Sequence, residues 1–176
     1  MKPSLPAIDR RTLLISGGVG VGLVVAFALW SGQAGDSLGA RPGERTLGAF
    51  VKIGRDGSVT VAVPQIETGQ GIWTALPQLL AHELGAAWET VAVEPAPFAD
   101  GYANPITGEW LRELDLGADA ARITAGSTSM RAFEQPFREA GATARAMLIA
   151  AAAERWDVPT GECDTADGFV LHKSRR

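Results

Sequence analysis

The chain has 176 residues, of which 46% are hydrophobic and 20% are charged, and its net charge is −4. This size fits one domain with a modest core, and the negative charge gives nucleic-acid binding no global electrostatic support. The chain has a single cysteine, Cys163, which excludes an internal disulfide. Because it also has only two histidines, His82 and His172, we do not expect a zinc or iron–sulfur site with protein ligands. Any redox or metal chemistry would therefore need a cofactor that brings its own ligands.

The first 34 residues have the pattern of a targeting segment. Arg10 and Arg11 stand directly before an uncharged, apolar stretch over 12–30, which is typical of a twin-arginine export signal. The stretch is at the lower edge of what spans a bilayer, and residues 32–34 offer a small-x-small cleavage site. Cleavage and retention as a membrane anchor therefore both stay open. We expect the protein in the periplasm or on the periplasmic face of the inner membrane.

After a polar linker over 35–46, the remaining residues 47–176 predict one domain of the α+β class. Its expected elements are, in chain order, a β-hairpin, an amphipathic helix, a short strand, a long helix and a closing β-hairpin. The first hairpin is clearly marked, because alternating strands over 50–53 and 58–63 flank a turn that contains an Asp-Gly pair.

Both helices are predicted from apolar residues at helical spacing. The first starts at about 72 and ends near residue 86, and Pro77 is expected either to kink it or to move its start to near Thr74. The second runs over 128–156, and Pro136 is expected to kink it early. The other expected segments are a strand over 90–94, a loop over 95–122, a strand ending at 123–124, and a hairpin over 164–173 that turns at Asp167-Gly168.

Two glycine-bearing loops lead directly into the predicted helices: Gly69-Gln70-Gly71, and Gly126-Ser127-Thr128-Ser129. A helix start offers unpaired N–H groups and a partial positive charge, and glycine lets a ligand approach the backbone. Two such starts in a small domain predict a ligand with several polar groups, such as a phosphorylated or pterin-type cofactor. The Gln70 amide is informative because it can both donate to and accept from a ring system.

Each of these features also has a purely structural explanation. Ser and Thr before a helix are common N-caps, and Gly-Gln-Gly suits a tight turn. Three glutamates are of a type suited to acid–base catalysis, but we interpret them as solvated surface groups: Glu67, Glu83 and Glu109. Cys163 fits a small buried residue better than a nucleophile. Four tryptophans fit core or interface anchors: Trp73, Trp88, Trp110 and Trp156.

Several runs resemble one family. They are Pro64-Gln65-Ile66-Glu67-Thr68-Gly69-Gln70-Gly71, Gly126-Ser127-Thr128-Ser129-Met130-Arg131 and Trp156-Asp157-Val158-Pro159. Together they resemble the start of the large subunit of molybdenum hydroxylases of the xanthine dehydrogenase family. Within it they are most similar to the isoquinoline 1-oxidoreductase beta subunit and to molybdopterin-binding subunits of aldehyde dehydrogenases. The resemblance covers about residues 47–173.

The resemblance implies a molybdenum–pyranopterin cytosine dinucleotide cofactor. The pterin would lie against the first glycine-bearing loop: Gly69, Gln70 and Gly71. The pterin and phosphate side of the cofactor would contact the second glycine-bearing loop: Gly126, Ser127, Thr128 and Ser129. It also implies hydroxylation of an aldehyde or an N-heteroaromatic carbon. Electrons would leave through a ferredoxin-like small subunit with two [2Fe–2S] clusters, with a c-type cytochrome as a further candidate acceptor.

The chain departs from the family pattern in two ways. A doubled glycine of the family reads Ala125-Gly126 here, and the family's catalytic glutamate, near the end of a much longer subunit, has no counterpart in this sequence. We therefore assign no catalytic residue. The chain is expected to be an N-terminal part that shares its cofactor with a downstream domain. A membrane-tethered, non-catalytic binding module and a truncated remnant of the subunit stay open as alternatives.

Overall fold

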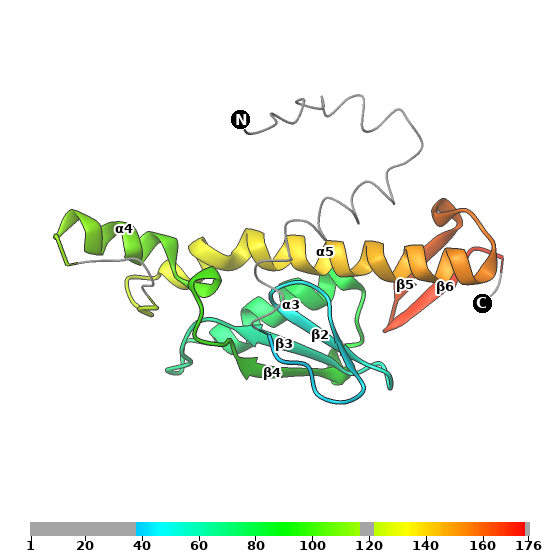
Figure 1. Ribbon diagram of the computed structural model, residues 1–176, viewed down its shortest axis with the longest axis horizontal. Coiled ribbons are helices and arrows are strands. Elements are labelled where there is room, and N and C mark those ends of the chain that lie inside the picture. The colour runs from blue at the N-terminus through cyan, green and yellow to red at the C-terminus, as the bar shows by residue number, and fades with distance from the viewer. Residues whose placement is uncertain (1–37, 117–121, 175–176) are drawn as a thin grey trace, which may run out of the picture.

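The computed structural model describes residues 38–116 and 122–174 (Figure 1). The expected export signal over 1–34 and the first part of the expected linker lie outside these residues. The last part of that linker belongs to the folded domain. Strand β1 (Glu44–Thr46) pairs antiparallel with β2 (Val51–Gly54), and the side chain of Leu38 is buried in the core.

The main sheet has four strands in the order β1-β2-β3-β4. β2 and β3 (Val59–Val63) form the predicted antiparallel hairpin, in which Val51 pairs with Val61. β4 (Val91–Pro95), also predicted, pairs parallel to β3. A parallel pair needs a crossover, which helix α3 supplies. The carboxyl ends of β3 and β4 therefore meet at one edge of the sheet, where open α/β sheets commonly bind ligands.

The two predicted helices are confirmed as α3 (Ile72–Leu84) and α5 (Thr128–Trp156). α3 begins at Ile72 rather than near Thr74, and each helix continues through its internal proline, Pro77 or Pro136. The closing hairpin is also confirmed. β5 (Cys163–Ala166) and β6 (Phe169–His172) are joined by Asp167 and Gly168, whose φ values of 52° and 79° suit a tight hairpin turn.

The prediction of a loop over 95–122 is wrong. This segment contains helix α4 (Pro105–Glu113) and a short 3-10 turn over Asp100–Tyr102. α4 forms because Asn104 caps it: its Oδ1 accepts hydrogen bonds from the N–H groups of Ile106 (3.1 Å) and Thr107 (3.3 Å). Two more 3-10 turns cover Trp88–Thr90 and Thr160–Glu162.

The strand expected to end at 123–124 is also absent, since residues 122–125 belong to no sheet. The polar groups of this segment bond to side chains and loops instead. The carbonyl of Ile123 accepts from Asn104 Nδ2 (3.4 Å), and the hydroxyl of Thr124 accepts from Ile66 N–H (2.9 Å). The segment is thus an extended connection between two loops, and its position matters for the site described below.

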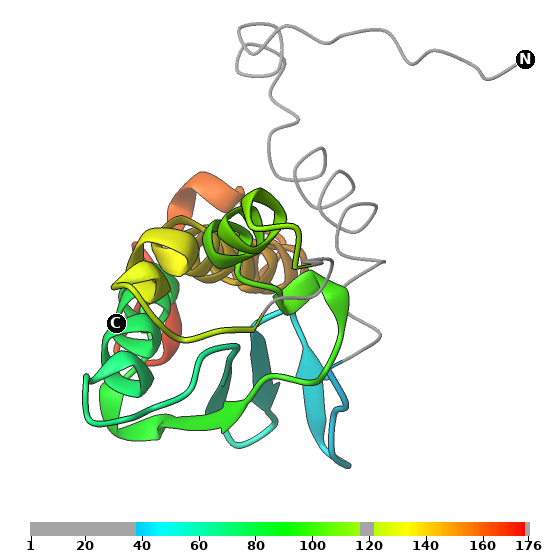
Figure 2. The ribbon, with the colours of Figure 1, turned by 90° about the vertical axis from the view of Figure 1, so that its left-hand side faces the viewer.

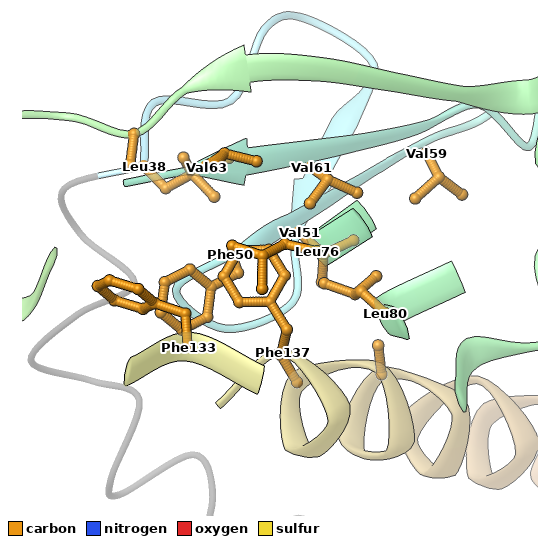
Figure 3. Close-up of a cluster of buried hydrophobic side chains, with 14 of the residues drawn as sticks. Leu38, Phe50, Val51, Val59, Val61, Val63, Leu76, Leu80, Phe133 and Phe137 are labelled. Atoms are coloured by element: carbon orange, nitrogen blue, oxygen red, sulfur yellow. The ribbon is translucent and has the colours of Figure 1, made fainter. Parts of the chain in front are cut away.

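The hydrophobic core lies between one face of the sheet and the helices α3 and α5 (Figure 2). Figure 3 shows valines of β2 and β3 pointing toward Leu76 and Leu80 of α3 and Phe137 of α5. The helices approach closely at Gly141, where a Cβ atom would clash with the carbonyl oxygen of Leu80. Three small residues of α5 are buried and allow this contact: Ala140, Gly141 and Ala144.

α5 is longer than the sheet and extends beyond it at both ends (Figure 1). α4 lies near its N-terminal end, and the β5–β6 hairpin lies near its C-terminal end. Near this end of α5, Ala151 is exposed and Ala153 is buried.

Candidate functional site

The two predicted ligand loops lie side by side at the sheet edge where β3 and β4 end. We call residues 64–71, which follow β3, the first loop, and residues 122–127, which precede α5, the second loop. Ile66 N–H donates to Thr124 Oγ1 over 2.9 Å, and Ser129 Oγ donates to Gln65 Oε1 over 2.9 Å. Both helix starts therefore face the same region, as a shared ligand would require.

Gln65 is the centre of the hydrogen-bond network at this edge. Its side chain is only 2% exposed. Besides Ser129, its Oε1 accepts from Asn104 Nδ2 (3.3 Å) and Thr124 Oγ1 (3.4 Å), and its Nε2 donates to the Pro64 carbonyl (2.9 Å). One buried amide thus connects the end of β3, the start of α4, the second loop and the start of α5. A fully satisfied buried network of this kind fixes the relative positions of its members.

Asn104 is the second member of this scaffold and is fully buried. While its Oδ1 caps α4, its Nδ2 donates to Thr128 Oγ1 over 2.9 Å. Thr128 Oγ1 in turn donates to the Ala125 carbonyl over 2.7 Å. Sequence reasoning did not assign Gln65 or Asn104 to the site. The Asn-Pro pair at a helix start was a usable signal for Asn104, whereas no local pattern marks Gln65.

The positive end of α3 is already filled by a carboxylate of the protein itself. Glu67 Oε1 accepts from the N–H groups of Gly69 (2.7 Å) and Gly71 (3.0 Å), and its Oε2 accepts from Trp73 N–H (3.0 Å). These bonds, led by that from Trp73, lower the pKa of Glu67 below its ordinary value. Glu67 is thus a partly exposed surface carboxylate, as expected, but its carboxylate is bonded to the start of α3 rather than free in solvent. It occupies the place where a ligand anion was expected.

Gln70 is exposed, but its amide is turned back onto its own loop. Its Oε1 accepts from the N–H (2.6 Å) and the hydroxyl (2.8 Å) of Thr68, and its Nε2 donates to the carbonyl of Ile66 (2.7 Å). Gly69 and Gly71 have φ values of 97° and 82°, which glycine adopts readily. The first loop is thus held in one shape and exposes its peptide backbone at 69–71.

The second loop exposes Gly126 and Ser127 and buries the two residues that follow. Ser127 has a φ of 54° and makes no side-chain cap bond, so the N-cap explanation does not apply to it. The indole of Trp110 lies against Gly126, where a Cβ atom would be 2.5 Å from the ring carbon Cη2. Thr128 and Ser129 direct their hydroxyls into the network described above and act as scaffold in this structure.

The remaining candidates take structural roles. Glu83 pairs with Arg138 of α5 over 2.9 Å, and Glu109 is exposed on α4. Cys163 is a buried free thiol, as predicted. Across residues 38–116 and 122–174, no cluster of three or more His, Cys, Asp or Glu side chains is arranged to hold a metal ion. Within the same ranges, no helix combines the length and apolar character that crossing a membrane requires.

Comparison with known families agrees with this arrangement. Residues 10–100, which include the first loop, match the molybdopterin cofactor-binding domain. The chain belongs to this family, as the sequence resemblance indicated.

Three relatives show which proteins the chain is similar to. It is 34% identical to the beta chain of isoquinoline 1-oxidoreductase from Brevundimonas diminuta, over 99% of this chain and 22% of that protein. It is 30% identical to a nicotinate dehydrogenase subunit of Pseudomonas putida, over 73% of this chain and 9% of that protein. It is 27% identical to a membrane-bound aldehyde dehydrogenase (pyrroloquinoline-quinone) of Gluconacetobacter polyoxogenes, over 93% of this chain and 19% of that protein. The chain thus spans about a fifth or less of these relatives.

Proposed function

We propose that the chain is the cofactor-contacting N-terminal part of an exported molybdenum-containing oxidoreductase subunit that hydroxylates aldehydes or N-heteroaromatic carbons. The observation that carries this proposal is that the first loop is hydrogen-bonded to the second loop through Ile66 and Thr124, and to the start of α5 through Gln65 and Ser129. The family supports the pterin part of the proposal. The substrate part is supported by the relatives' names, which refer to isoquinoline, nicotinate and aldehyde.

The residues present fit the ring system of a pterin better than its phosphate at the start of α3. A pterin has donors and acceptors along the edges of a flat ring. The N–H groups of Gly69 and Gly71 are bonded to Glu67, so the first loop offers the carbonyl groups of its exposed residues Gly69 and Gln70, and the exposed residues 126–127 offer further peptide groups. The amide of Gln70 and the hydroxyl of Ser127 lie in the same exposed segments. A phosphate at the α3 start would compete with Glu67, whose carboxylate already accepts from three N–H groups there.

When bound, the molybdenum cofactor would take up the two electrons removed as an oxygen from water is added to the substrate carbon. The part played by this chain is to bind and orient that cofactor. Gln65 and Asn104 hold the two loops in register, and the loops present their backbone to the ring. Because no catalytic base is assigned in this chain, we expect turnover only together with further parts of the subunit. The proposed electron acceptor is a small subunit with two [2Fe–2S] clusters, with a c-type cytochrome as a further candidate.

Cofactor content tests the proposed site directly. The complete reading frame is expressed with molybdate, and molybdenum and pterin are measured per chain. We expect Gln70→Ala to lower both, because the variant loses the only amide side chain in the exposed part of the first loop. Gln78→Ala is the matched control, since Gln78 is an exposed glutamine on α3 outside the loops. Equal cofactor content in both variants and the parent would rule out the role of Gln70, and a parent without pterin would favour a non-catalytic binding module.

We further propose export by the twin-arginine route, which carries folded proteins. This rests on Arg10 and Arg11, which lie outside the described residues. A double Arg10→Lys, Arg11→Lys variant should keep the protein in the cytoplasm, and Lys2→Arg is a control that changes a basic residue outside the pair. Fractionation with an antibody to the domain measures this. Mass determination of the exported form distinguishes cleavage after residue 34 from a retained anchor. Export of the double variant at the parent's level would exclude the route.

A further inference from the structure

Arg122, at the start of the second loop, has a guanidinium group that is held in place from two sides. Its Cζ lies 4.4 Å from the centroid of the Phe98 ring and 5.9 Å from that of Tyr102. Its Nη2 donates to the carbonyl of Ala99 over 2.7 Å. A long side chain normally loses rotamer freedom when it binds a ligand. Here that freedom is already restricted by the protein's own contacts.

Phe98 has no packing role that would explain its position. Its side chain is 96% exposed, the highest value among the large hydrophobic residues of the described ranges. A phenylalanine in this environment gains almost nothing from burial. Its one described partner is the guanidinium of Arg122, which it meets in a cation–π contact. Phe98 therefore serves to position the charge of Arg122 rather than to stabilise the core.

The charge of Arg122 has no carboxylate partner within residues 38–116 and 122–174. Lys52, Arg138 and Arg145 pair with Glu94, Glu83 and Asp164, while other arginines of these ranges, such as Arg155, also have no carboxylate partner. Arg122 differs from Arg155 in that its guanidinium is held by Phe98 and by the Ala99 carbonyl. The α5 start, six positions after Arg122 in the chain, also has no acidic residue in its first turn. By contrast, Glu67 neutralises the α3 start. Positive charge in this part of the site is therefore concentrated on the side of the second loop.

The position of Arg122 ties it to both proposed cofactor loops. It lies two positions before Thr124, whose hydroxyl accepts from Ile66 N–H of the first loop. Its anchor, the Ala99 carbonyl, belongs to the segment that follows β4 and leads to Asn104, the scaffold residue bonded to Thr128. The fixed guanidinium is thus attached to the hydrogen-bonded junction of the two loops.

We propose that Arg122, held on Phe98, binds a phosphate group of the pterin cofactor. This proposal rests on the proposed function. The planar guanidinium has five N–H donors in a fork that matches two phosphate oxygens, and only one of the donors is used by Ala99. The same chemistry would also recognise free pyrophosphate. In this proposal Arg122 binds the phosphate, while the N–H groups at the α3 start remain bonded to Glu67.

The test measures pyrophosphate binding and pterin content in the complete protein. Binding of pyrophosphate is followed by calorimetry on protein made in cells that lack pterin synthesis. Arg122→Gln should weaken the pyrophosphate Kd by about ten- to a hundredfold, the range for a lost charge-assisted contact. Arg122→Lys keeps the charge without the fork and should fall in between, and Phe98→Ala should weaken binding less than Arg122→Gln. The control is Arg155→Gln, an exposed arginine at the far end of α5, which should bind as the parent does.

Pterin content is measured in the same variants made in pterin-producing cells. A loss in Arg122→Gln and Phe98→Ala, but not in Arg155→Gln, supports the assignment, provided that melting temperatures stay equal. Parent-like pyrophosphate binding by Arg122→Gln, or no binding by the parent, overturns it even if the parent carries pterin. A parent that binds pyrophosphate through Arg122 but contains no pterin would instead contradict the proposed function, while supporting Arg122 as a site for a different phosphate ligand.

Discussion

Ser129 Oγ and Gln65 Oε1 lie 2.9 Å apart, although 64 positions separate the two residues in the chain. Ser129 is in the first turn of α5, and Gln65 follows β3 directly. Both side chains are buried. This bond closes the longest-range connection in the network at the sheet edge. Together with the bond from Ile66 N–H to Thr124 Oγ1, it fixes the first loop against the second loop and the start of α5.

Removing the Gln65 amide should destabilise the domain more than removing the Ser129 hydroxyl. Gln65→Leu removes the acceptor of the buried Ser129 hydroxyl and one acceptor each of the Asn104 amide and the half-buried Thr124 hydroxyl, and a buried donor left unsatisfied costs about 1–3 kcal/mol. Ser129→Ala removes one donor and leaves the acceptor with two others, so we expect about 1 kcal/mol. Urea unfolding measures both free energies, and Gln78→Leu on the exposed side of α3 should change little.

The double variant of Gln65 and Ser129 supplies the decisive comparison. Once Gln65 is replaced by Leu, the Ser129 hydroxyl has lost its partner, so Ser129→Ala should then cost less than in the parent. Strictly additive effects would mean that the two side chains do not interact. Such a result would remove the basis for a common site at the two loops.

Glu67 should make the stability of the domain depend on pH in the acidic range. Its pKa is lowered in the folded state, chiefly by the N–H of Trp73 and then that of Gly71. A carboxyl with a lowered folded pKa contributes its full stabilisation above its ordinary value of 4.5, and loses it as the pH falls through the lowered folded pKa. The melting temperature of Glu67→Gln should therefore lie below that of the parent at pH 7, and the gap should shrink below pH 4.5.

A control separates this effect from the general effect of acid on the domain. Glu109 is exposed on α4, so Glu109→Gln should have the same melting temperature as the parent at neutral pH. If the gap between the parent and Glu67→Gln stays constant down to the acid limit of folding, the carboxylate does not hold the α3 start. That start would then be available to a ligand anion after all.

The parts of the fold that depend on neighbouring residues could be predicted from the sequence. Alternating strands around an Asp-Gly turn indicated the β2–β3 hairpin, and apolar spacing indicated α3 and α5. The α4 helix was missed because its segment is rich in residues typical of loops. The signal that outweighs composition there is the Asn104-Pro105 pair, which caps and starts the helix.

The parts of the site that depend on distant residues could not be predicted in the same way. The glycines at 69, 71 and 126 mark the exposed loops locally, and the structure places them there. Nothing near Gln65 in the sequence indicates that it meets Asn104, Thr124 and Ser129, because that meeting depends on the parallel β3–β4 pairing. The role of Glu67 at the α3 start was missed for a different reason: this residue caps α3 from outside the N-cap position at which capping residues are usually sought.

Gly141, the glycine of α5, should tolerate replacement by alanine poorly. In Gly141→Ala, the added methyl group would clash with the Leu80 carbonyl oxygen, so α3 and α5 would have to separate. Overpacking of this kind costs about 1–3 kcal/mol, which exceeds the gain in helix propensity of up to about 1 kcal/mol. Gly161→Ala is the matched control because nothing lies within 4 Å of the position that its added methyl group would take. Thermal unfolding that leaves both variants equally stable would show that the helices do not touch there.

The contact between Trp110 and Gly126 predicts a cost in Gly126→Ala that has two separable parts. The first is the positive φ of 62°, which costs an alanine about 1–2 kcal/mol. The second is the overlap with the Trp110 ring at 2.5 Å. Gly71→Ala, with a φ of 82° and open space at its Cβ, measures the first part alone. Gly126→Ala should therefore be the more destabilised of the two in urea unfolding, and adding Trp110→Ala should recover the excess. If the two glycine variants are equally destabilised and Trp110→Ala recovers nothing, the indole does not lie against Gly126.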